Sequence, residues 1–165
     1  MEEGTPELVI LDVNPDQVDD IVAMIQTAFD RFIAPGFKNE GIEYFRRFIR
    51  PADLQERVAL GSVMLTARWG GQLAGMIEVR DGNHIALLFT DERFQRRGVA
   101  RSLLRAAVAR CREHRPELVK LTVNAAPSAV TVYERLGFVT VDGPQEKYGL
   151  RFVPMEKNLN DRPDR

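Results

Sequence analysis

The stretch Gln95-Arg96-Arg97-Gly98-Val99-Ala100-Arg101 (QRRGVAR) joins a predicted strand to the clearest helical pattern of the chain. Apolar residues recur behind it with helical spacing from Val99 to Cys111, and Pro116 ends the pattern. The first N–H groups of a helix lack partners, and the helix dipole adds positive charge there. Three arginines around one glycine therefore predict a cradle for an anion such as a diphosphate. The plain alternative is a solvated helix start, because Arg is a good helix former.

Strands are predicted on both sides of this helix, at residues 84–90 and 118–123. A strand–helix–strand order implies a crossover that places the two strands side by side and parallel. The other expected elements are strands at 8–11, 63–68 and 73–79, helices at 18–32, 42–49 (stopped before Pro51) and 128–136 (capped by Ser128, ended by Gly137), and a closing hairpin of 138–141 with 150–155. The sequence thus predicts an α/β (α+β) fold with a mixed, mostly antiparallel sheet, a central parallel strand pair and flanking helices.

Length and composition narrow the class of protein. A chain of 165 residues suits one compact domain, expected over residues 1–159, with a loose tail at 160–165. The formal net charge of -1 argues against a nucleic-acid binder, and no apolar run is long enough to span a membrane. The acidic start MEEGTPE does not resemble a signal peptide, and the single cysteine, Cys111, indicates neither an internal disulfide nor a metal site. These features favour a cytoplasmic protein.

Two other nucleotide-binding motifs are excluded by the residues around Gly98. A Walker loop needs Gly-Lys-Ser/Thr, which the chain lacks, and a dinucleotide fingerprint needs three glycines where only one is present. The segment 88–100 (LFTDERFQRRGVA) instead resembles the acetyl-CoA motif of the GNAT superfamily of N-acetyltransferases. The segment 124–138 (NAAPSAVTVYERLGF) resembles the second motif of that superfamily, which ends Tyr-x-x-x-Gly-Phe. The similarity extends over about residues 62–159.

The resemblance implies a function and a set of site residues. It implies acetyl-CoA as cosubstrate and transfer of its acetyl group to the primary amine of a small molecule or peptide by direct attack. Tyr133 would donate a proton or a hydrogen bond to the departing thiolate. Dimers are common in the superfamily, so a homodimer is a further implication. The residues implied to bind the cofactor are Leu88, Phe89 and Thr90 on the strand, Arg96, Arg97, Gly98, Val99, Ala100 and Arg101 in the cradle, and Asn124.

The base that would take the proton of the amine is not evident from the motifs. Many members use a strand Glu, but this chain has Leu121 at one such position and Ala126 where many have Asn. Asn124 lies two residues before Ala126 and is expected to replace its contact. Glu78, on the strand beside the cofactor strand, is the candidate base, although it also fits a solvated strand position. His84 fits a turn or surface position better than a base.

Two other functions fit the same residues. A non-catalytic acyl-CoA-binding or regulatory module would explain the missing base, and a small interaction domain would carry the arginines as surface charge. The sequence does not identify the acceptor amine. Its specificity is expected to come from the region before Ser62 and from the loop at 145–148, where no diagnostic pattern is present.

Overall fold

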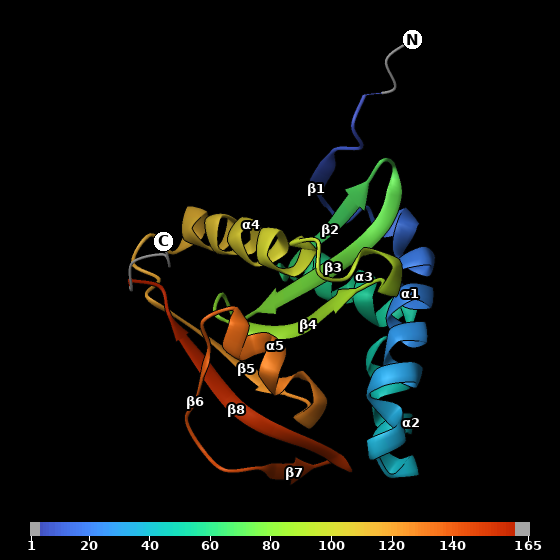
Figure 1. Cartoon of the computed structure of the whole chain (residues 1–165), viewed down its shortest axis with the longest axis vertical. Helices are drawn as coiled ribbons and strands as arrows, with labels where there is room; N and C mark the ends of the chain where they lie inside the picture. Colours follow the sequence, from blue (N-terminus) through green and yellow to red (C-terminus); the bar gives the residue numbers. More distant parts are fainter. Residues whose placement is uncertain (1–3, 161–165) are drawn as a thin grey trace.

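The computed structural model describes residues 4–160 and shows a mixed sheet with helices on both faces (Figure 1). The strand order is β1-β2-β3-β4-β5-β8-β6, and β7 also pairs with β8. All pairs are antiparallel except β4 with β5. The strands are β1 (Leu8–Asp12), β2 (Val63–Trp69), β3 (Gln72–Arg80), β4 (His84–Thr90), β5 (Lys120–Ala125), β6 (Val139–Thr140), β7 (Gln145–Lys147) and β8 (Leu150–Asn158). The predicted fold class, including its central parallel pair, is confirmed.

The parallel pair is short, and this opens the sheet at its centre. Only His84 with Thr122 and Ile85 with Val123 are paired between β4 and β5. On its other side β4 has a bulge, because Glu78 pairs with Leu87 while the adjacent Val79 pairs with Ile85. A bulge bends its strand and increases the local twist. Beyond Ile85, β4 therefore continues without a ladder to β5, and the two halves of the sheet diverge.

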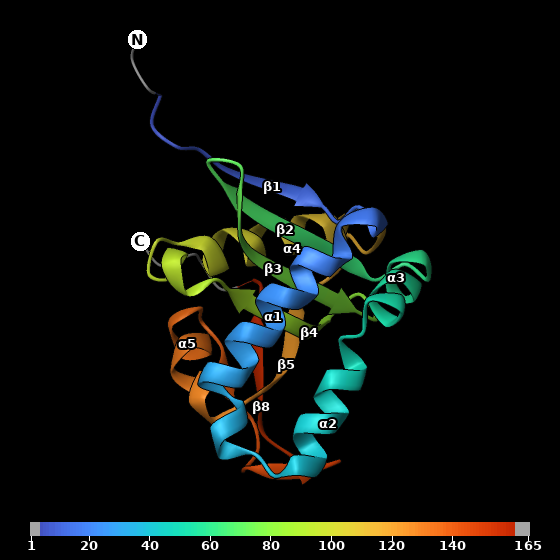
Figure 2. The same cartoon turned by 90° about the vertical axis from the view of Figure 1, so that its right-hand side faces the viewer.

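The helices divide the core into two apolar clusters. Strand residues alternate in direction, so Leu65 and Ile77 pack with α4 (Val99–His114) while Met64 and Met76 pack with α1 (Val18–Phe32) and α3 (Pro51–Ala59). The short helix α5 (Val130–Arg135) belongs to the α4 side, and α2 (Asn39–Phe48) lies beside α1 (Figure 2). No helix within residues 4–160 is long and apolar enough to cross a membrane.

Three local predictions are corrected by the structure. Pro51 not only follows α2 but begins a further helix, α3, because the fixed φ of proline suits the first helical position. Ser128 does not cap α5: it lies in a 3-10 turn (Pro127–Ala129), and Ala129 is the N-cap. Strand β7 was not expected. The loose tail predicted at 160–165 lies outside the described residues except for Asn160.

Candidate active site

The cradle loop has an unusual backbone. After a 3-10 turn (Glu92–Phe94) the chain extends at Gln95, and Arg96 and Gly98 then adopt left-handed conformations with φ of 63° and 78°. A Cβ added to Gly98 would meet no atom within 4 Å, so the glycine serves the backbone angle and leaves open space in front of the loop. Arg96, Arg97 and Gly98 are all exposed. The loop thus presents its backbone to solvent at the start of α4.

The first turn of α4 differs from that of the three helices before it. Helices α1, α2 and α3 each have an acidic residue in the first turn, whereas α4 has none. Its N-cap, Gly98, has no side chain to accept a hydrogen bond from the first amides. Free N–H groups, the helix dipole and neighbouring arginines are the features that attract anions to helix N-termini.

The arginines of the loop differ in what they contact. The guanidinium of Arg97 lies over the rings of Trp69 and Phe94, at 5.7 and 5.8 Å from the ring centroids. Arg101 donates from Nη2 to the carbonyl oxygen of Arg135 at 3.1 Å and so connects α4 to the end of α5. Of the three, only Arg96 makes no such contact among the described residues.

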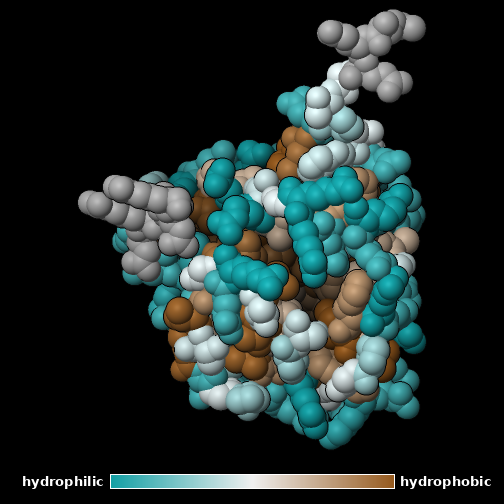
Figure 3. Space-filling view, viewed as in Figure 1, coloured by the Kyte–Doolittle hydropathy of each residue, from teal (hydrophilic) through white to brown (hydrophobic). Residues whose placement is uncertain are grey.

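The end of β4 leads into this loop through the 3-10 turn. Leu88, Phe89 and Thr90 are half-buried. Gly75 on β3 allows α4 to approach, because a Cβ there would lie 3.0 Å from Cγ1 of Val99 and 3.1 Å from Cδ1 of Leu103. Figure 3 shows a hollow with an apolar floor over β4, between α5 and α1, with hydrophilic side chains around it. The divergence of β4 from β5 and the cradle loop therefore meet at one opening.

Tyr133 is buried on α5, with 7% of its surface exposed, and packs edge-on against Phe138 with ring centroids 5.4 Å apart. Its hydroxyl makes no hydrogen bond within residues 4–160, yet the oxygen is not fully sealed from solvent. Burial raises the pKa of the Tyr133 phenol above its ordinary value, because the charged phenolate is poorly solvated there. The phenol is therefore neutral and able to donate a hydrogen bond.

Glu78 is completely buried and is not a solvated strand residue. Both of its carboxylate oxygens accept from Nε of Arg57 on α3, at 2.8 and 3.1 Å. Arg57 is fixed further by donation from Nη1 to the carbonyl oxygen of Phe48 and by contact with the Phe48 ring. Because Glu78 is in register with Leu87, its side chain lies on the face of the sheet that α1 and α3 cover.

Asn124 and His84 lie on the two strands that diverge. Asn124 is exposed on β5, and its neighbours Val123 and Ala125 point into the α4 cluster, so its side chain lies on the opposite face from Tyr133. Nδ1 of His84 is 2.8 Å from the hydroxyl of Thr122, at the closed end of the parallel pair. Burial, followed by the charge of Arg80, lowers the pKa of His84. Within residues 4–160 no cluster of His, Cys, Asp and Glu is arranged to hold a metal ion.

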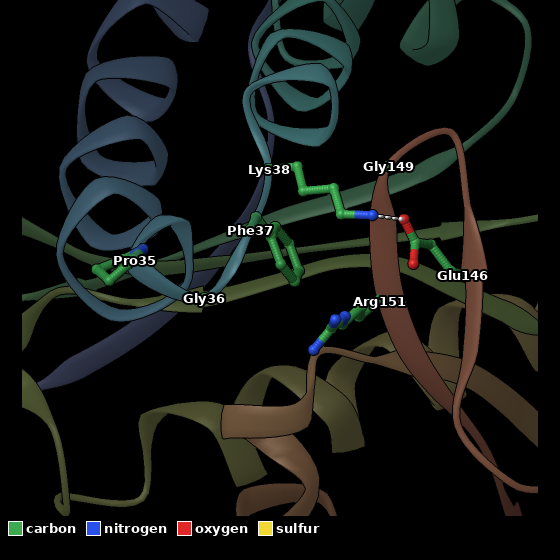
Figure 4. Close-up of a pocket in the computed structure, with 7 residues that line it drawn as sticks. All are labelled: Pro35, Gly36, Phe37, Lys38, Glu146, Gly149 and Arg151. Carbon is green, nitrogen blue, oxygen red and sulfur yellow. Dashed lines mark hydrogen bonds and ion pairs between the residues drawn. The ribbon is translucent and has the colours of Figure 1, made fainter.

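One part of the site was not identified from the sequence. A cavity of about 200 Å³ lies between the connection from α1 to α2 and the β7–β8 hairpin (Figure 4). Phe37 and Lys38 line it from one side, and Glu146, Gly149 and Arg151 from the other. Both segments were expected to contribute to acceptor specificity, but no local pattern in the sequence indicated that they meet.

The comparisons with known proteins agree with this geometry. The family model described as acetyltransferase (GNAT) domain matches residues 33–159. A GCN5-related N-acetyltransferase from Rhodopseudomonas palustris has the same fold, with a TM-score of 0.77 and 22% identity over 96% of this chain and 99% of that chain.

Two further structures of this fold contain the coenzyme. PaiA N-acetyltransferase from Thermoplasma acidophilum, solved with coenzyme A, has a TM-score of 0.77 and 15% identity over 92% of this chain and 99% of that one. YncA of Salmonella typhimurium, solved with acetyl-CoA, has a TM-score of 0.66 and 19% identity over 95% of this chain and 96% of that one. Among curated proteins, none matches the sequence.

Proposed function

The chain belongs to the acetyltransferase (GNAT) domain family, and on that premise we propose that it transfers the acetyl group of acetyl-CoA to a primary amine by direct attack in a ternary complex. The observation that carries the proposal is the opening between β4 and β5, which has free helix amides at one end and the buried Tyr133 phenol on the α5 side. The coenzyme complexes of PaiA and YncA support acetyl-CoA as the cosubstrate.

In the proposed complex, the cradle binds the diphosphate of the coenzyme. The amides of Val99, Ala100 and Arg101 donate to its oxygens, and Arg96 and Arg97 add positive charge. The backbone of Leu88, Phe89 and Thr90, together with Asn124, holds the pantetheine arm along the open edge of β4. Since Arg97 is stacked on aromatic rings and Arg101 is bonded to α5, the loop is preorganised and loses little entropy on binding.

The chemical step follows from this arrangement. The neutral amine attacks the thioester carbonyl, the new C–N bond forms, and the C–S bond breaks. A backbone N–H of β4 stabilises the oxyanion, and Tyr133 donates to the sulfur as charge develops on it. The raised pKa of the phenol suits this role, because it keeps the donor protonated. Most of the acceleration comes from holding the two reactants together.

The proposal assigns the proton of the amine to Glu78, whose carboxylate is on the same face as Leu87. Both of its oxygens accept from Nε of Arg57, so the amine has to compete with Arg57 for this carboxylate. This pairing also favours a second candidate function, a non-catalytic acyl-CoA-binding or regulatory module. The two differ in one measurement: the module binds acetyl-CoA and turns over no amine.

Release of the CoA thiol with a panel of primary amines tests the proposal. We expect turnover with at least one amine, and a Tyr133→Phe variant with kcat lowered about 100-fold and unchanged affinity for CoA. Tyr148→Phe is the matched control, since Tyr148 is exposed and its ring contact with Tyr44 needs no hydroxyl. Equal rates for Tyr133→Phe and Tyr148→Phe would remove the phenol from the mechanism. Tight binding of acetyl-CoA without turnover of any amine would contradict the acetyltransferase proposal and support the non-catalytic acyl-CoA-binding module.

A further inference from the structure

The cavity beside the β7–β8 hairpin has rigid walls. The hairpin turns at Tyr148 and Gly149, both with positive φ, and this turn touches α2 backbone to backbone: a Cβ on Gly41 would lie 2.2 Å from the carbonyl oxygen of Gly149. The Tyr148 ring also stacks on Tyr44, with centroids 4.7 Å apart and planes 10° apart. Because these contacts dock the hairpin on α2, the cavity exists before any ligand arrives.

A row of packed aromatic rings connects the wall of this cavity to the strand that is proposed to hold the thioester. Phe37, in the cavity wall, lies 6.1 Å from Phe29 between ring centroids, and Phe29 stacks on Phe45 at 3.9 Å. Phe45 is in turn 6.0 Å from Phe89 of β4. These packed rings connect the wall of the cavity to β4 on the α1–α2 side of the sheet.

Two cations, Lys38 and Arg151, and one anion, Glu146, line the cavity. Lys38 and Glu146 form an ion pair at 3.3 Å across the cavity. Arg151 is exposed and lies opposite Glu146 in the β7–β8 register, but its guanidinium points away from the Lys38–Glu146 pair, toward the Phe37 side (Figure 4). Among residues 4–160 no carboxylate lies within ion-pair distance of Arg151. A guanidinium binds a carboxylate through two parallel N–H groups, so an anionic group on the ligand would complete this arrangement.

The size of the cavity limits what it can hold. Clefts for drug-sized ligands span roughly 300–1,000 Å³, whereas this one is about 200 Å³. A molecule the size of one amino acid fits, and a long polyamine or a peptide would have to extend outside it. The cavity thus favours a compact ligand that has an anionic group at the Arg151 end.

We propose that the acceptor is a small amine of amino-acid size that carries a carboxylate, and that Arg151 binds this carboxylate and so determines specificity. The inference rests on the acetyl transfer proposed above. The amine nitrogen forms the amide bond to the acetyl carbon, coenzyme A leaves as its thiol, and the carboxylate bound to Arg151 is unchanged.

Pairs of acceptors that differ only in charge test this inference. We would measure kcat and KM for a panel of L-amino acids and for the matching amino-acid amides. The intact protein should prefer the acids, and Arg151→Gln should raise the KM for acids about 10- to 100-fold, the loss expected for a hydrogen bond to a charged group. Its kcat, and all values for the amides, should change less than about twofold. Arg151→Lys should retain part of the preference.

Lys147→Gln is the matched control, because Lys147 is an exposed cation of the same hairpin that does not line the cavity. A preference for the amides, or equal effects of Arg151→Gln and Lys147→Gln on both kinds of acceptor, would overturn the inference.

A binding measurement separates this inference from the acetyl transfer itself. N-acetyl amino acids should raise the melting temperature of the intact protein above the value in NaCl of equal ionic strength, whereas N-acetyl amino-acid amides should not. Arg151→Gln should abolish this shift. If the shift depends on Arg151 but no amine is acetylated, acetyl transfer fails and the recognition stands. If other amines are acetylated and no acid binds or reacts, the recognition fails and acetyl transfer stands. Absence of both binding and turnover contradicts both.

Discussion

The cradle at the start of α4 and the cavity beside the β7–β8 hairpin are built in different ways. The cradle at α4 is one continuous stretch of chain, and its geometry comes from backbone angles at Arg96 and Gly98. The cavity brings together Lys38 and Glu146, which are 108 residues apart in sequence. It depends on a hairpin docked against α2 through the contact of Gly41 with Gly149. Substitutions in the cradle should therefore change coenzyme binding locally, whereas substitutions at the docked end should act through packing.

The largest effect is expected at the buried ion pair that ties α3 to β3. Glu78→Gln removes the one carboxylate that pairs with Arg57 in the described part of the chain, and so leaves the charge of this 19% exposed side chain uncompensated. Breaking one partner of a buried pair costs about 3–5 kcal/mol, which chemical denaturation would detect. The double variant Glu78→Gln, Arg57→Met should recover part of this loss. A single variant as stable as the parent, yet slow in acetyl transfer, would instead support Glu78 as the base.

Docking of the hairpin is tested by Gly41→Ala. The added methyl group would overlap the carbonyl oxygen of Gly149, so the hairpin or α2 must move. We expect a loss of about 1–3 kcal/mol in the free energy of unfolding and a higher KM for the acceptor, with unchanged affinity for CoA. Gly143→Ala is the control, because its Cβ would meet nothing within 4 Å. Weakened CoA binding in Gly41→Ala would show that the two ends are not independent.

The cradle is tested by Gly98→Ala. The methyl group has space, but a left-handed backbone costs a residue with a Cβ about 1–2 kcal/mol. If the cradle holds the coenzyme, this cost should appear as weaker CoA binding by calorimetry, with the KM for the acceptor unchanged. Gly98→Asn should lose less, because Asn tolerates this conformation better. Unaltered CoA affinity in Gly98→Ala would mean that CoA binding does not depend on the left-handed backbone conformation at Gly98.

The smallest effect is expected for the pH dependence of stability that comes from His84, which is paired with Thr122 between β4 and β5. The pKa of His84 is lowered in the folded chain, so below its unfolded value of about 6.5 the unfolded chain binds the proton more readily. Stability contributed by the neutral imidazole is therefore present above that pH and is lost as pH falls toward the folded pKa. Urea titrations at pH 7.5 and 5.5 should show a smaller decrease for His84→Gln than for the intact protein. Equal decreases would assign the pH dependence to other groups.

The sequence predicted the local half of the site better than the assembled half. A helical stripe and an adjacent glycine were enough to predict where α4 begins and where the loop before it lies, because the spacing of a few residues determines both. The hairpin docked on α2 could not be found in this way. Its turn is Tyr148-Gly149 rather than a pair such as Asn-Gly, and β7 has only three exposed residues, so no alternation marked a strand. The burial of Glu78 was missed for a similar reason, since its partner Arg57 lies on α3, a helix that was not predicted.

The two-residue ladder between β4 and β5 also bears on how the molecule opens. With so few hydrogen bonds between them, β1–β4 and β5–β8 resemble two cooperative units joined mainly at one end and by the packing of α4. Amide hydrogen exchange should then find separate opening events in the two units. A coenzyme lying between the diverging strands would link them, and slower exchange would appear on both sides at the same ligand concentration.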